Sequence, residues 1–234
     1  MGLINGTLPD LHQPKNLDVK LWRYMDLSKF LNLHIFKSLY FCRADKFEDP
    51  YEGRLPQMDI DRCVPNVASD FESSIQEFYI NCWHMNESES AAMWKLYSTS
   101  NDAIAIETDY KTLRYVLDKN IALTAVSYED YSTFSLIKKS FELNGKFNGF
   151  DIVTYKRLSF EHEKEVRAIY WKILNKLESD DQGLLVNIDI VSLIKKVHIS
   201  PYASPWLESV IRDLLEKYHL NNIEVQRSNL YSIK

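Results

Sequence analysis

Residues 159–171, SFEHEKEVRAIYW, alternate between charged and apolar side chains over most of their length. Successive side chains of a β-strand point to opposite faces, so this alternation predicts a strand with one charged and one apolar face. We expect the apolar face to enter the core. The charged face would carry Glu161, Glu163, Glu165 and Arg167, and the apolar face Phe160, Val166, Ala168 and Tyr170.

The charged face leaves two interpretations open. Same-face carboxylates about 6.6 Å apart repel one another, and a single arginine compensates only part of that charge. The face could be solvated, with Arg167 paired to Glu165 at little gain in stability. Alternatively it faces a cleft, where Glu163 or Glu165 would act as general base, metal ligand or stabiliser of a cationic transition state. We expect Glu161 to lie in solvent.

The rest of the chain alternates predicted strands and helices that are joined by irregular loops. Regular β-α units are not evident, which favours an α+β fold with a mixed, mostly antiparallel sheet and flanking helices. No repeat or linker divides the chain, so we expect an N-terminal extension over 1–19 and one domain over 20–234. The predicted strands are 20–26, 38–44, 77–85, 102–108, 123–131, 183–190, 194–200 and 221–228, and the predicted helices 29–38, 68–76, 87–96, 109–119, 133–143 and 204–219.

Composition narrows the class of protein. A hydrophobic share of 45% supports a folded core, and a net charge of -5 gives no overall attraction to the phosphates of nucleic acid. Cys42, Cys63 and Cys82 are too scattered for a disulfide framework or a zinc ribbon. No secretory signal or apolar run of about 18 residues is present, so we expect a cytoplasmic protein that does not enter a membrane.

Two further segments carry candidate functional residues. In LYFCRADKFEDPYEG, residues 39–53, Asp49 precedes a proline and favours a turn. Asp49 and Glu52 also suit a divalent cation, but no third ligand stands at a recognised spacing, so we expect no resident metal. In CWHMNESESAAMWKLYS, residues 82–98, His84 and Trp94 fit a structural role or contact with a planar ligand.

These segments together resemble a bacterial family known as domain of unknown function 2971. The matching pieces are LWRYMD, the two segments above with AIAIET, YKRLSFEHEKEVRAI, and ISPYASPWLESVI, in the family's order. The resemblance implies a bacterial or phage-related protein, with phage defence as the expected setting. It implies no particular chemistry.

A more distant similarity is to the layout of ADP-ribosyltransferases. It rests on a strand with Arg23, a strand with Tyr40 and a later strand with a glutamate, and implies a split sheet with NAD in a cleft. By this similarity Arg23 would touch the dinucleotide, Tyr40 would stack on nicotinamide, and Glu163 or Glu165 would stabilise the ribosyl cation. The implied catalytic set is Glu163, Glu165 and Arg167, and the implied NAD-binding set is Arg23, Tyr24, Tyr40, Phe41, Phe47, His84 and Trp94.

Three functions are therefore compared. The first is an NAD-dependent ADP-ribosyltransferase or NAD-cleaving toxin, with a dinucleotide as substrate, an unassigned protein or nucleic-acid target and a homo-oligomeric state. The second is a nuclease in which Asp49, Glu163 and Glu165 hold magnesium, with Lys156 or Arg167 near a phosphate. The third is a non-catalytic interaction module in which the charged strand is a structural, salt-bridged element.

Overall fold

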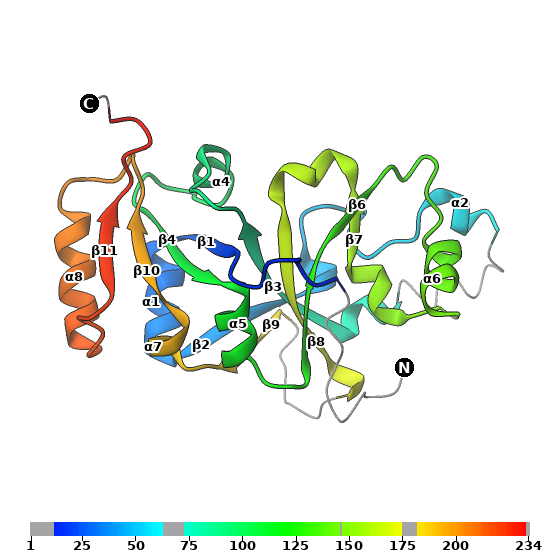
Figure 1. Cartoon of the computed structure of the whole chain (residues 1–234), viewed down its shortest axis with the longest axis horizontal. Coiled ribbons are helices and arrows are strands. Elements are labelled where there is room, and N and C mark those ends of the chain that lie inside the picture. The colour runs from blue at the N-terminus through cyan, green and yellow to red at the C-terminus, as the bar shows by residue number, and fades with distance from the viewer. Residues whose placement is uncertain (1–11, 63–72, 146, 175–181, 233–234) are drawn as a thin grey trace. The chain divides into compact units, whose positions relative to one another are not determined.

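A computed structural model describes residues 12–62, 73–145, 147–174 and 182–232 (Figure 1). It combines helices with strands that pair mostly antiparallel, which confirms the predicted α+β class. Cys63 and most of the helix predicted at 68–76 lie outside the described residues. Within these residues, no helix has both the length and the apolar character that crossing a bilayer requires.

The described residues form two compact units. The first unit comprises those of Met1–Gln13, Tyr40–Cys82 and Asp118–Leu184, and the second those of Pro14–Leu39, Trp83–Leu117 and Leu185–Lys234. Strands β2 (Ser38–Arg43), β3 (Phe78–Met85) and β9 (Gly183–Asn187) contribute residues to both units. The predicted single domain stays a prediction.

The second unit is built on four strands and five helices that lie wholly within it. Strand β1 pairs antiparallel with β3 and β4, β4 pairs antiparallel with β10, and β10 pairs parallel with β11. Helix α8 lies beside β11 in Figure 1. The strands are β1 (Lys20–Asp26), β4 (Ala103–Asp109), β10 (Lys196–Ile199) and β11 (Glu224–Arg227), and the helices α1 (Leu27–Phe36), α4 (Ala91–Leu96), α5 (Tyr110–Val116), α7 (Ile190–Leu193) and α8 (Leu207–Lys217).

The first unit contains residues 159–171, whose charged and apolar side chains alternate. Strand β2 pairs antiparallel with β3, β5 pairs antiparallel with β8, and β6 pairs parallel with β7. Its strands are β5 (Ile121–Ala125), β6 (Ser127–Glu129), β7 (Tyr155–Arg157) and β8 (Glu165–Trp171), its α-helices α2 (Gln57–Ile60) and α6 (Leu136–Asn144), and its 3-10 helices η1 (Ala44–Lys46), η2 (Ile75–Glu77), η3 (Gly149–Val153), η4 (Leu158–Glu163) and η5 (Lys172–Leu174).

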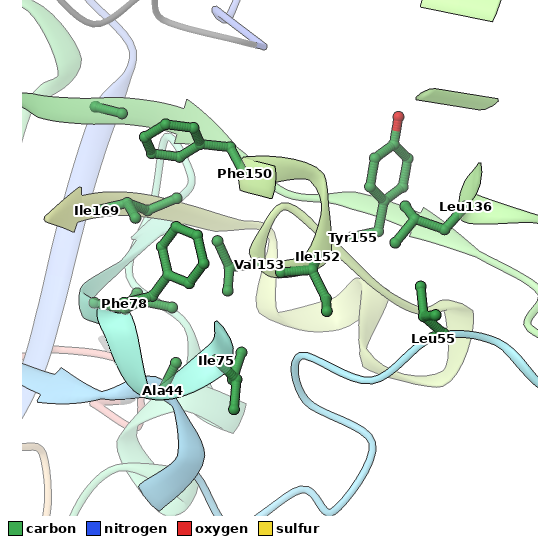
Figure 2. Packing of buried hydrophobic residues seen from close by; sticks show 12 residues of the cluster. Ala44, Leu55, Ile75, Phe78, Leu136, Phe150, Ile152, Val153, Tyr155 and Ile169 are labelled. Atoms are coloured by element: carbon green, nitrogen blue, oxygen red, sulfur yellow. The ribbon is translucent and has the colours of Figure 1, made fainter. Parts of the chain in front are cut away.

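An apolar cluster forms the core of the first unit (Figure 2). Figure 2 shows Phe78, Val153 and Phe150 close to Ile169 of β8. The rings of Phe150 and Phe78 meet edge to face, with their centroids 5.7 Å apart. This packing fixes β8, which carries two of the charged residues described below, and η3, which leads into β7.

The predicted strand over 159–171 is wrong in its first half. Residues 158–163 form η4, and β8 begins only at Glu165. Lys164 joins the two with a left-handed backbone, φ 41°, which breaks the alternation. The predicted strand faces therefore do not exist at Phe160, Glu161 and Glu163. Glu161 is exposed, as expected.

Other predicted boundaries also differ, three of them as follows. The helix predicted at 87–96 begins at Ala91, because the Ser90 side chain accepts a hydrogen bond from the Met93 N–H and caps it. The helix predicted at 29–38 begins earlier, at Leu27. The strand predicted at 123–131 is interrupted at Val126 between β5 and β6.

Candidate functional site

A group of five charged side chains lies in the first unit and is called the charge cluster below. It joins residues from the loop after η1, from β7, from η4 and from β8. Its members, with side-chain exposure from 0% to 11%, are Glu52, Lys156, Glu163, Glu165 and Arg167.

Arg167 is the centre of the charge cluster. Its Nε and NH2 groups donate to the two oxygens of Glu165 at 3.0 and 2.9 Å, an arrangement that fixes both side chains. Its NH1 group donates to the carbonyl oxygen of Val153 at 2.7 Å and lies 2.5 Å from Oε1 of Glu52. Arg167 thus links two carboxylates to the turn before β7, with no exposed surface of its own.

Lys156 connects the remaining carboxylate. Its Nζ donates to Oε2 of Glu163 at 2.6 Å and lies 3.5 Å from Glu165 and 3.7 Å from Glu52. Glu163 and Lys156 are the most exposed members of the charge cluster, at 11% and 10% of their side chains. The cluster therefore has a buried side at Arg167 and a rim at Glu163.

Formal charge in the cluster does not balance. Three carboxylates meet two cations, which leaves a charge of −1 when all five groups are ionised. Burial alone raises the pKa of Glu165, but the charges of Arg167 and Lys156 lower it more, so this pKa lies below its ordinary range. Burial lowers the pKa of Lys156, and the nearby Glu165 and Glu52 outweigh burial and raise it. Glu165 and Lys156 are thus both held in their charged forms.

A tight turn brings Glu52 to the cluster. The backbone N–H groups of Glu52 and Tyr51 donate to the carbonyl and side-chain oxygens of Asp49, each at 3.0 Å. Gly53 follows with φ 68°, and a side chain there would overlap Ile75. The sequence predicted this turn from Asp49–Pro50, but not that it delivers Glu52 to Arg167, 115 residues later in the chain.

Three predicted NAD-binding residues lie in the first unit. Phe47 is partly buried, with its ring centroid 5.8 Å from the guanidinium carbon of Arg167, so it borders the charge cluster. Tyr40 is exposed on β2, and Gly183 lies so close beneath its ring that any larger residue would overlap it. The next residue, Phe41, is fully buried and presents no surface to a ligand.

The other four predicted NAD-binding residues lie in the second unit. Tyr24, His84 and Trp94 come together: the Tyr24 ring lies 6.2 Å from that of His84 and 4.9 Å from that of Trp94. Trp94 is buried and donates from Nε1 to Glu89 at 2.9 Å, which favours the structural role. Arg23 points to the opposite face of β1 from Tyr24, where it lies over the Trp83 ring. The predicted cleft of Arg23, Tyr40 and either Glu163 or Glu165 stays a prediction.

Sequence reasoning missed a histidine–carboxylate pair in the second unit. His198 Nε2 and Glu107 Oε2 lie 2.8 Å apart, although they are 91 residues apart in the chain. Lys20 Nζ lies 3.0 Å from the other oxygen of Glu107. The hydrogen bond from His198, followed by those from Lys20, lowers the pKa of Glu107 to about 2. No local motif marks this pair, because β4 and β10 meet only through sheet pairing.

The predicted magnesium ligands of the nuclease hypothesis are each bound to a cation. Asp49 accepts from Arg157 at 2.9 Å, Glu163 from Lys156, and Glu165 from Arg167. Among the described residues, no group of three or more histidines, cysteines, aspartates or glutamates is placed to hold a metal ion. The carboxylates are thus arranged as ion-pair partners.

One comparison bears on this arrangement. Residues 93–168 match the family model described as protein of unknown function DUF2971. The resemblance to domain of unknown function 2971 is thereby confirmed. The DUF2971 match includes Lys156, Glu163, Glu165 and Arg167 and ends one residue after Arg167. No curated protein and no solved structure matched the chain.

Proposed function

We propose that the first unit binds NAD at the charge cluster and cleaves the bond between nicotinamide and ribose. The observation that carries this proposal is the excess carboxylate, three against two cations, in a group that is mostly buried. The nicotinamide ring of NAD is cationic, and positive charge moves to the ribose as the bond breaks. A fixed carboxylate stabilises such a charge, as it does in glycoside cleavage.

Glu163 is the proposed catalytic residue, because it lies at the rim while Glu165 is buried against Arg167. Nicotinamide leaves with the bonding electron pair, and water or a target nucleophile adds to the ribosyl carbon. The proton of the attacking group passes to Glu163. Lys156, Glu165 and Arg167 act through Glu163 as positioning residues. A role in phage defence would follow from depletion of NAD or modification of a target.

Nicotinamide release from NAD by the purified chain tests this proposal. We expect the wild-type chain to release nicotinamide, with or without cell extract as a source of targets, and Glu163→Gln to lower the rate about 100-fold. Glu161→Gln is the matched control, since Glu161 is exposed two residues earlier, and should keep the wild-type rate. No release by the wild-type chain, or full activity of Glu163→Gln, would reject the proposal.

The non-catalytic interaction module is the second candidate function. It is favoured by a specific observation: Glu165 and Arg167 bind each other through two hydrogen bonds and are buried, as in a structural ion pair. Under this hypothesis the charge cluster only stabilises the fold. Glu163→Gln would then change neither nicotinamide release nor any other turnover, while Arg167 variants would lower the melting temperature.

A further inference from the structure

Arg157, the residue after Lys156 on β7, is held in a fixed orientation beside the charge cluster. Its guanidinium carbon lies 4.2 Å from the ring centroid of Tyr51 and 5.2 Å from that of Phe160. Two aromatic contacts of this kind restrict the planar group and leave its edges to form hydrogen bonds. About a third of the side chain is exposed.

The hydrogen bonds of Arg157 are incomplete. Its NH2 group donates to Oδ1 of Asp49 at 2.9 Å, whereas its buried Nε makes no hydrogen bond within the described residues. A buried donor without an acceptor is energetically unfavourable. Nε and one N–H of NH2 point from the same edge of a guanidinium, so an anion with two oxygens could accept from both.

Asp49 occupies this edge with only one of its oxygens. That same oxygen accepts from the backbone N–H of Tyr51 at 3.0 Å, so the carboxylate is tied to the turn. Asp49 therefore satisfies the edge incompletely. An incoming phosphate with two free oxygens would satisfy it better.

The ring of Phe160 connects this arginine to the charge cluster. Lys156 Nζ lies 4.7 Å from the Phe160 centroid, and Arg157 lies 5.2 Å from the same centroid. The negatively charged cluster, through Lys156, and Arg157, whose Nε has no acceptor within the described residues, thus lie beside the ring of Phe160. A ligand with a cationic end and a neighbouring diphosphate is complementary to both.

We infer that Arg157 is the diphosphate-binding residue of this site and that Asp49 is the carboxylate that the diphosphate displaces. The identity of the ligand as a dinucleotide rests on the proposed function. The anion site itself rests on the geometry of Arg157, Tyr51, Phe160 and Asp49. Asp49 thus has two roles: it forms the turn, and it competes with the diphosphate for Arg157.

Calorimetric titration of the full chain with inorganic pyrophosphate and with ADP-ribose tests the inference. Arg157→Gln should weaken binding of both ligands at least 10-fold, because the guanidinium that would bind the diphosphate is lost. Asp49→Asn should strengthen both several-fold, since the amide keeps the hydrogen bond from Tyr51 but not the competing charge. Arg54 is exposed in the loop that also contains Asp49, so Arg54→Gln is the matched control. This variant should bind both ligands as the wild-type chain does.

The outcomes separate this inference from the proposed function. Pyrophosphate binding that is absent, or equally tight in Arg157→Gln, would overturn the inference even if NAD is cleaved. Arg157-dependent binding without nicotinamide release would support the anion site and reject the cleavage. If Arg157→Gln does not fold, Asp49→Asn decides, because unchanged or weaker affinity in that variant would contradict the displacement of Asp49.

Discussion

Arg167 is a charged side chain with no exposed surface, and its environment explains how the fold tolerates it. Removing an ion from water costs several kcal/mol, which must be offset by close partners. Burial lowers the pKa of Arg167, and the charges of Glu165 and Glu52 raise it well above its ordinary value. The arginine is therefore always charged, and its loss would leave two buried carboxylates without their main partner.

Replacement of Arg167 by methionine should accordingly destabilise the protein by about 3–5 kcal/mol, the usual cost of breaking a buried pair. Glu165→Gln should cost less, because Arg167 keeps Glu52 and the Val153 carbonyl. Urea denaturation followed by circular dichroism measures both. Lys217→Met, at an exposed pair with Asp213 on α8, is the control and should leave the midpoint unchanged. An unchanged midpoint for Arg167→Met would contradict the structural role of the pair.

Among the elements, helix α6 depends on a residue outside itself. Asp59 of α2 is buried and accepts hydrogen bonds from the N–H groups of Leu136 and Ile137 at 2.7 and 3.3 Å. Asp59 also accepts a hydrogen bond from the Ser135 hydroxyl at 2.5 Å. The Ser135 hydroxyl oxygen in turn accepts from the backbone N–H of Lys138 and so caps α6. A negative charge at a helix N-terminus is favourable, and here it satisfies donors that would otherwise be buried without partners.

Substitution of Asp59 by alanine should therefore destabilise the first unit by about 2 kcal/mol. Hydrogen exchange should locate the effect, with faster exchange at the amides of Leu136 and Ile137. Asp61→Ala offers a matched control, because Asp61 is exposed and its side chain accepts a hydrogen bond from the side chain of Gln57 in the same turn. Equal protection of these two amides in the Asp59 variant and the wild-type chain would show that the cap is dispensable.

The boundaries of two elements show what the local sequence pattern can and cannot predict. Strand β1 matches its predicted range although its polar and apolar residues do not alternate strictly, because β3 and β4 pair with it on both sides. Residues 159–163 belong to the alternating stretch that predicted a strand, but they lie in η4, where Glu163 binds Lys156 of β7 and Lys164 then turns the chain. Periodicity alone does not separate these two cases, since the contacts that decide between them come from other segments.

At the scale of the whole molecule, each unit contains a carboxylate whose pKa is lowered on folding. These are Glu165 in the first unit and Glu107 in the second. A lowered pKa means that the unfolded chain binds more protons in acid, so stability falls as pH decreases. The stability that Glu107 contributes should be complete above its ordinary value of 4.5 and be lost as pH falls toward about 2.

The Glu107→Gln variant tests this pH dependence. The difference in free energy of unfolding between wild type and variant should be largest at pH 6–7 and shrink steadily as pH falls from about 4.5 to about 2. Urea denaturation at several pH values measures the difference, with Glu224→Gln, an exposed glutamate on β11, as control. A difference that stays constant over this range would exclude the His198 and Lys20 contacts as its cause.

The amino-acid sequence is enough to predict the α+β class, most strands and helices, the Asp49 turn and the resemblance to DUF2971, because each depends on local pattern or motif. It also identified Glu163, Glu165 and Arg167 as residues of interest. Only the tertiary structure showed that Glu165 and Arg167 are buried, that Glu52 and Lys156 join them, and that Glu163 lies at the rim. Burial and ion pairing depend on contacts between distant segments, and a strand pattern cannot specify which segment lies opposite its charged face.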